Sequence, residues 1–140
     1  MTLLKVLVVD DDRAIRDSLR EVLRAEGYDV VIAENGAIAL RIMRSAPPPD
    51  VVVLDLMMPV LSGWEVLEQL ETDASVRDIP VLVVSAMGAP LASSGQHGGV
   101  RMSLPKPPDI DALLAAIERI LLPRACRAPS ERPGTISPIR

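Results

Sequence analysis

The chain has 140 residues, and 49% of them are hydrophobic, which fits one domain with a modest core. Phe is absent and Trp and Tyr occur once each, so that core must be aliphatic. The formal net charge of −4 gives no general attraction to nucleic acid or anionic lipid. A single Cys excludes an intrachain disulfide, and a single His argues against a zinc centre.

The first residues, MTLLKVLVVDDD, lack the long apolar run and the cleavage site of a signal peptide. No apolar run of the sequence approaches the roughly 20 residues that span a bilayer. We therefore expect a cytoplasmic protein that does not bind a membrane.

Short and continuous apolar runs, rich in Val, Ile and Leu, recur along the chain. Runs of this kind are typical of strands that are buried on both faces of a parallel sheet. They lie at residues 3–9, 30–33, 51–54 and 81–84, with a weaker fifth run at 100–104.

Apolar residues at helical spacing separate these runs, as expected for amphipathic helices. The helical patterns lie at residues 15–23, 39–43, 66–70 and 110–121. Gly27 stands where the first helix would end, and Asp109 stands where the last would begin. The alternation of strands and helices predicts right-handed βαβ units in a three-layer α/β sandwich.

Two segments fit this alternation less well. Residues 85–99 should contain a fourth helix, but their Gly, Ser and Pro content makes that helix short or irregular. Residues 123–140 are rich in Pro and Arg and show no periodicity. We therefore predict one domain over residues 1–122 and a disordered tail over 123–140. The tail is too short for a helix-turn-helix domain, so we expect a stand-alone domain without direct binding to nucleic acid.

Polar residues stand at the ends of the predicted strands. The first strand ends in Asp10 and Asp11, the third in Asp55 and the fourth in Ser85, and the fifth ends near Lys106. In open α/β sheets, ligands bind at the carboxyl ends of the strands. Three carboxylates at one place need a cation, and a hard ion such as Mg²⁺ suits them. One carboxylate could then attack phosphorus while the lysine and the hydroxyl hold phosphoryl oxygens.

Four segments make a resemblance to a known family specific. VLVVDDD, VVVLDLMMP followed by SG, VLVVSA, and LPKP occur in the order and at the approximate spacing of the signatures of response regulator receiver domains. The resemblance covers about residues 3–121. It implies a flavodoxin-like fold with a five-stranded parallel sheet in the order 2-1-3-4-5, and a place in two-component signal transduction.

The resemblance also implies roles for individual residues. Asp55 is expected to be the phosphoacceptor. Asp10 and Asp11, together with Asp55 and the backbone carbonyl of Met57, are expected to hold Mg²⁺ or Mn²⁺. Such a domain is a phosphoacceptor and not an enzyme in the ordinary sense, since it catalyses only its own phosphorylation and dephosphorylation.

The resemblance assigns the remaining site residues and the partners. Ser85 and Lys106 would contact the phosphoryl group, and Pro59 and Gly63 would shape the neighbouring loop. The phosphoryl group would come from a sensor histidine kinase or a histidine phosphotransfer protein. The output would be contact with a downstream protein that the sequence does not name, and a homodimer stays open.

The sequence departs from the family where the phosphorylation signal is normally read out. Ser103 stands where receiver domains usually carry an aromatic residue, and Pro108 replaces an aromatic that often follows Lys-Pro. The segment for the fourth helix is also rich in glycine.

Two hypotheses on signalling follow from these departures. Either the domain signals through a non-aromatic switch, or it changes little and serves as a phosphate sink, a shuttle or a binding module.

Two other kinds of protein share part of this pattern. A haloacid-dehalogenase-like phosphatase would use Asp10 as nucleophile and Asp12 as acid/base, but Ala14 departs from its motif and Asp55 stays unexplained. We expect Asp12 to cap the first helix instead. A flavodoxin is disfavoured because the acidic loop after the first strand offers no phosphate donors. Trp64 is expected to be a packing residue, and His97 a loop residue.

Overall fold

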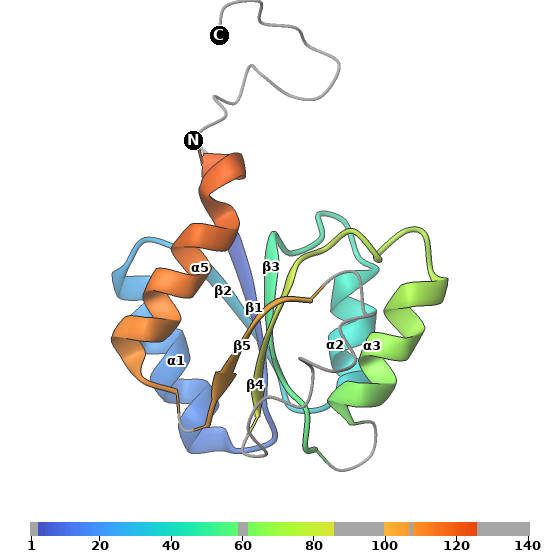
Figure 1. The fold of residues 1–140 in the computed structure, drawn as a ribbon, viewed down its shortest axis with the longest axis horizontal. Helices are drawn as coiled ribbons and strands as arrows, with labels where there is room; N and C mark the ends of the chain where they lie inside the picture. Colours follow the sequence, from blue (N-terminus) through green and yellow to red (C-terminus); the bar gives the residue numbers. More distant parts are fainter. Residues whose placement is uncertain (1–2, 59–61, 86–99, 107, 126–140) are drawn as a thin grey trace, which may run out of the picture.

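The computed structural model describes residues 3–58, 62–85, 100–106 and 108–125 (Figure 1). In chain order the elements are β1 (Lys5–Val9), α1 (Arg13–Ala25), β2 (Asp29–Ala33), α2 (Gly36–Met43), β3 (Val51–Asp55), α3 (Gly63–Thr72), β4 (Val81–Ser85), β5 (Val100–Pro105) and α5 (Ile110–Ala125). The helix expected within residues 85–99 falls almost wholly outside the described residues.

The five strands form one parallel sheet in the order β2-β1-β3-β4-β5, which confirms the predicted topology. β1, β3 and β4 lie inside the sheet, and β3 and β4 are buried along their whole length. Continuous apolar sequence is required there because both faces of these strands are covered. β5 is an edge strand, where a proline such as Pro105 is tolerated.

The helices cover the two faces of the sheet in pairs: α1 and α5 lie on one side and α2 and α3 on the other (Figure 1). Each pair closes its own aliphatic cluster. Leu23 and Leu113 pack into the cluster under α1 and α5, while Leu40 and Leu67 pack into the cluster under α2 and α3. The three predicted layers are therefore confirmed.

Local sequence sets where the helices begin and end. Asp12, Asn35 and Ser62 precede α1, α2 and α3, and each side chain accepts a hydrogen bond from a backbone N–H of the first turn. Ser62 also forms a capping box with Glu65. Gly27, just after α1, has φ +96°, a backbone conformation that glycine adopts without strain. The predicted capping role of Asp12 is confirmed.

The observed boundaries differ from the expected ones by a few residues. β3 and β4 run one residue beyond their apolar runs and end in Asp55 and Ser85, as expected for these polar residues. The apolar pattern missed these positions because both residues are polar although they are buried. α5 runs to Ala125, three residues past the predicted domain boundary, because the backbone stays helical through Pro123. The tail predicted beyond it, residues 126–140 with Cys126, lies outside the described residues.

Within the described part of the chain, no helix is long and apolar enough to cross a membrane.

Candidate functional site

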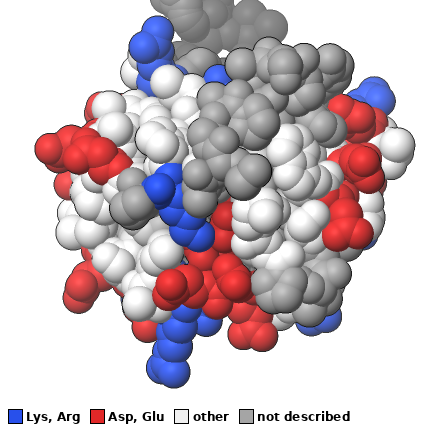
Figure 2. Space-filling view, turned by 60° about the horizontal axis from the view of Figure 1, so that its bottom comes forward, with Lys and Arg blue, Asp and Glu red and all other residues white. Residues whose placement is uncertain are grey.

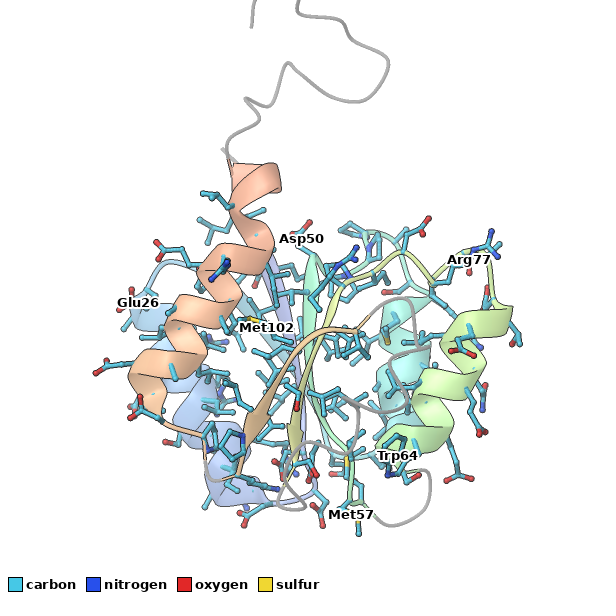
Figure 3. The ribbon with its side chains drawn as sticks, viewed as in Figure 1. Glu26, Asp50, Met57, Trp64, Arg77 and Met102 are labelled. Atoms are coloured by element: carbon cyan, nitrogen blue, oxygen red, sulfur yellow. The ribbon has the colours of Figure 1, made fainter. Side chains whose placement is uncertain are left out.

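Three polar side chains are buried among the residues that the structure describes: Asp10, Asp55 and Ser85. Asp55 is 1% exposed, Asp10 4% and Ser85 not at all. All three stand at the carboxyl edge of the sheet, at the bottom of the view in Figure 3, where Met57 is labelled; Asp50 lies at the opposite edge. Burying a carboxylate is costly unless it is paired or binds a cation, so two of them together mark a candidate functional site.

The strand register brings these residues together. Val9 pairs with Leu54, so Asp10 and Asp55 are neighbours at the ends of β1 and β3. Ser85 ends β4, the next strand, and its backbone carbonyl accepts a hydrogen bond from the N–H of Lys106 at 3.1 Å. The fold therefore brings Asp10, Asp55 and Lys106 together at this edge, with the end of β4 at Ser85 bonded to the backbone of Lys106.

Lys106 joins the two buried carboxylates. Its Nζ lies 2.9 Å from Asp55 Oδ2 and 3.0 Å from Asp10 Oδ2. Lys106 follows β5, and its long side chain extends past the end of β4 to reach Asp55 on β3 and Asp10 after β1. The other oxygen of Asp55, Oδ1, accepts a hydrogen bond from the N–H of Met57 at 3.1 Å.

The ionisation of the site reflects burial and these contacts. Burial raises the pKa of Asp10, and the charge of Asp55 raises it further. The hydrogen bond from the backbone N–H of Asp12 and the contact with the Lys106 ammonium lower the pKa of Asp10, but they do not cancel the rise. Burial alone would lower the pKa of Lys106. The hydrogen bonds to Asp55 and Asp10, together with their charges, outweigh burial and raise the pKa of Lys106 above its ordinary value. Lys106 is therefore a fixed positive charge at neutral pH.

The donor set fits a hard divalent cation. Asp10, Asp11 and Asp55 can each offer one carboxylate oxygen, and these oxygens lie within 4.8 Å of one another. Asp11 is exposed, so solvent can reach the cluster from that side. Figure 2 brings this end of the molecule forward and shows acidic side chains gathered on it beside basic ones. Oxygen donors with access to water suit Mg²⁺ or Mn²⁺, not zinc.

Gly63 begins α3 and lets the start of this helix lie close to the end of β3. Its N–H donates a hydrogen bond to the carbonyl of Leu56 at 3.1 Å. A Cβ placed on Gly63 would stand 2.4 Å from the carbonyl oxygen of Asp55. The glycine is therefore needed for space at the junction of β3 and α3, and its role in shaping the site stays a prediction.

Other expected residues are placed as follows. Trp64 packs against the cluster under α2 and α3, which confirms its predicted packing role. Ser103 is half-buried in β5 and pairs with Val83. Pro59 and His97 lie outside the described residues.

Reasoning from the sequence missed Arg16. Its guanidinium donates a hydrogen bond from Nη1 to the backbone carbonyl of Asp10 at 2.9 Å. An arginine in the first turn of the helix after an acidic loop is a weak signal, because most such residues point to solvent. Its contact depends on the loop path, which the sequence pattern does not give.

Comparisons with known proteins agree with this geometry. The family model of the response regulator receiver domain matches residues 6–118. The response regulator MprA of Mycolicibacterium vanbaalenii is 43% identical over 118 residues, which cover 84% of this chain and 50% of that protein. The chain thus spans about half the length of the curated relatives it matches.

Solved structures with the same fold include two from other bacteria. The chemotaxis response regulator CheY4 of Vibrio cholerae is 31% identical with a TM-score of 0.76, covering 86% of this chain and all of that one. The receiver domain of the Francisella response regulator 1452 is 30% identical with a TM-score of 0.77, covering 86% of this chain and 98% of that one. With its sheet order and its clustered aspartates, the chain belongs to the family of response regulator receiver domains.

Proposed function

We propose that Asp55 accepts a phosphoryl group from a histidine kinase or a histidine phosphotransfer protein, in a reaction that needs Mg²⁺ or Mn²⁺. Receiver domains as a family are phosphoacceptors that take phosphoryl groups from histidine kinases. The observation that carries the assignment to Asp55 is its burial beside Asp10, with Lys106 bound to both carboxylates. The reaction would take place in the cytoplasm.

In the proposed step, a carboxylate oxygen of Asp55 forms a bond to phosphorus while the bond from phosphorus to the donor's histidine nitrogen breaks. The donor histidine keeps the electron pair of the broken bond, and Asp55 becomes an acyl phosphate. Lys106 would leave the Asp55 oxygen and pair with a phosphoryl oxygen, so that the positive charge of the lysine stabilises the phosphoryl group. The hydroxyl of Ser85 would contact another phosphoryl oxygen from the end of β4.

The cation would be held by the carboxylates of Asp10, Asp11 and Asp55 and by the backbone carbonyl of Met57. When bound, it supplies positive charge that neutralises the phosphoryl oxygens and the acidic cluster. The support for this set is the short spacing of the three carboxylates and the exposure of Asp11, which gives a cation access.

Phosphorylation by a small phosphodonor such as acetyl phosphate tests the proposal. The wild-type chain should take up one phosphoryl group with Mg²⁺ present and none with the metal chelated. Asp55→Asn should abolish uptake. Asp12→Asn is the matched control, because Asn caps a helix as well as Asp, and it should leave uptake unchanged. Equal uptake by the wild type and Asp55→Asn would contradict the proposal.

The Asp12→Asn variant also distinguishes the proposed phosphoacceptor from a haloacid-dehalogenase-like phosphatase. The phosphatase needs the Asp12 carboxylate free to act as acid/base, but its Oδ1 accepts hydrogen bonds from the N–H groups of Ala14 and Ile15. Loss of phosphoryl transfer in Asp12→Asn, together with phosphoryl transfer that survives in Asp55→Asn, would favour the phosphatase.

We infer further that the output is a contact with another protein, made without the usual aromatic switch because Ser103 stands at that place. Binding of beryllofluoride, a phosphoryl mimic, tests this inference. Amide shifts that spread to Ser103 and the rest of β5 would support a signalling switch. Shifts confined to Asp10, Asp55 and Lys106 would favour a phosphate sink or shuttle. The stand-alone arrangement and a homodimer stay predictions.

A further inference from the structure

The backbone and the side chain of Asp10 are held at four points by other residues. Its N–H donates to the carbonyl of Ala33 at 3.2 Å, and its carbonyl accepts from Arg16 at 2.9 Å. Its Oδ1 accepts from the N–H of Asp12 at 2.9 Å, and its Oδ2 pairs with Lys106. Among these contacts, the one with Arg16 has no part in the sheet, the helix cap or the proposed phosphoryl site.

We propose that Arg16 is a positioning residue for the cation site: it fixes the loop between β1 and α1 so that Asp10 and Asp11 are presented together. The inference rests on the proposed function, since it concerns the same carboxylates. Residues 10–12 form this loop, and two of the three expected carboxylate ligands belong to it.

The connectivity explains how one side chain can hold the loop. Arg16 lies in the first turn of α1, and its own N–H donates to the carbonyl of Asp12 at 3.0 Å. Asp12 caps the same turn through its side chain. The guanidinium then reaches back to the carbonyl of Asp10, so both ends of the loop are tied to one helical turn. Asp11 lies between these two anchors with its side chain exposed.

Charge and position predict opposite effects for this residue. A guanidinium near the carboxylates repels a cation, so an arginine that acted through charge alone would weaken metal binding. An arginine that holds the ligands in place would strengthen metal binding, as groups that orient metal ligands do. The sign of the change on substitution therefore decides between the two roles.

Lysine is the conservative replacement that separates charge from geometry. Arg16→Lys keeps the positive charge, but its side chain is shorter and lacks the planar guanidinium, so its contact with the Asp10 carbonyl should be weaker. Any loss of metal affinity in this variant would come from the contact and not from the charge.

Calorimetric titration of the full chain with Mg²⁺ is the test. Arg16→Ala should raise the Kd by roughly tenfold, the low end for residues that orient metal ligands, and Arg16→Lys should raise it by less. Arg13→Ala is the matched control. It removes the same charge from the first residue of α1, where the side chain is 85% exposed and pairs with Asp17. The control should lower the Kd by no more than about twofold.

Two results would overturn the role of Arg16. One is a Kd for Arg16→Ala that equals that of Arg13→Ala. The other, which also decides the matter if the alanine variant does not fold, is an Arg16→Lys variant that binds Mg²⁺ as tightly as the wild type although its Asp12 N–H exchanges faster.

Hydrogen exchange in the metal-free protein tests the role of Arg16 independently of Mg²⁺ binding and of phosphorylation. Without the Arg16 contact, the N–H of Asp12 should exchange faster, because its acceptor on Asp10 moves; Arg13→Ala should leave it unchanged. If the wild type fails to bind Mg²⁺ through Asp10 and Asp11, the proposed cation site is wrong. Unchanged exchange in both Arg16 variants would instead show that Arg16 does not hold the loop.

Discussion

Asp10 and Asp55 are two like charges buried side by side, and Lys106 is the cation that they share. The net rise in the pKa of Asp10 shows that burial and the charge of Asp55 outweigh the help from Lys106 and from the N–H of Asp12. A site of this kind lowers the stability of the metal-free fold and gains stability when a cation arrives. The repulsion between the two buried carboxylates therefore both lowers the stability of the metal-free fold and favours the binding of a cation.

Asp10→Asn should raise the free energy of unfolding of the metal-free protein at neutral pH. Because folding raises the pKa of Asp10, this group favours the folded state most below its ordinary pKa. That contribution is lost as the pH rises through the folded pKa, and the ionised group then opposes folding. Asparagine cannot ionise, so the gain over wild type should shrink as the pH falls. Urea titrations at neutral and acidic pH would measure this.

Added Mg²⁺ should make the wild type more stable than Asp10→Asn. At a hundred times its Kd, a cation that binds only the folded state stabilises it by about 2.7 kcal/mol. The wild type should gain this amount, and Asp10→Asn should gain much less. Equal stabilisation of both proteins by Mg²⁺ would exclude Asp10 as a ligand.

Lys106→Met should strengthen Mg²⁺ binding several-fold while it weakens the metal-free fold. The ammonium pairs with Asp10 and Asp55, and a cation must compete with it for their oxygens. Removing one partner of a buried ion pair costs about 3–5 kcal/mol, and somewhat less here because Lys106 is partly exposed. Lys5→Met is the control, since the Nζ of Lys5 bonds to the carbonyl of Pro47 at the other end of β1. A lower Mg²⁺ affinity in Lys106→Met would contradict this competition.

The elements themselves follow from simple patterns in the sequence, while the contacts between side chains do not. Continuous apolar runs located all five strands, and helical spacing located the described helices. This works because a strand that is buried on both faces needs apolar residues at every position, whereas a helix that is buried on one face needs them only at helical spacing. The apolar run of β3 alone stops one residue short of the strand end, because Asp55 is polar and yet ends a buried strand. The bond from Arg16 to Asp10 and the double contact of Lys106 depend on side-chain reach across loops, and no periodicity encodes that.

Gly63→Ala should disturb the junction between β3 and α3. The new Cβ would meet the Asp55 carbonyl, so the start of α3 and the end of β3 must move apart, at a cost of about 1–3 kcal/mol in unfolding free energy. The Mg²⁺ affinity should fall as well, because the moved backbone carries Asp55 and Met57. Gly27→Ala is the comparison: its cost of about 1 kcal/mol is one of backbone conformation, far along the chain from the site. Unchanged Mg²⁺ affinity in Gly63→Ala would count against a close fit at this junction.

On the scale of the whole molecule, one sheet separates two aliphatic clusters that share its strands. Leu7 and Val9 of β1 face the cluster under α2 and α3, whereas Val6 and Val8 face the cluster under α1 and α5. Neither layer of helices can keep its core without the sheet, so we expect the two layers to unfold together.

The single Trp and the single Tyr allow this to be tested. Trp64 packs against one cluster and Tyr28 against the other. Leu67→Ala and Leu23→Ala each remove a buried side chain from one cluster and should each cost about 2–5 kcal/mol. In either variant, Trp64 fluorescence and fluorine NMR of a fluorotyrosine at position 28 should give the same urea midpoint. A midpoint that moved for only one probe would show that the layers unfold separately.

The chemical identity of the phosphorylated residue is the most direct test of the account. After reaction with acetyl phosphate and Mg²⁺, the acyl phosphate can be trapped by borohydride reduction and located by peptide mapping. We predict the modification at Asp55 alone, in proportion to the phosphoryl group taken up by the intact chain. Modification at Asp10, or no acyl phosphate at Asp55 under conditions where Mg²⁺ is bound, would contradict the central claim.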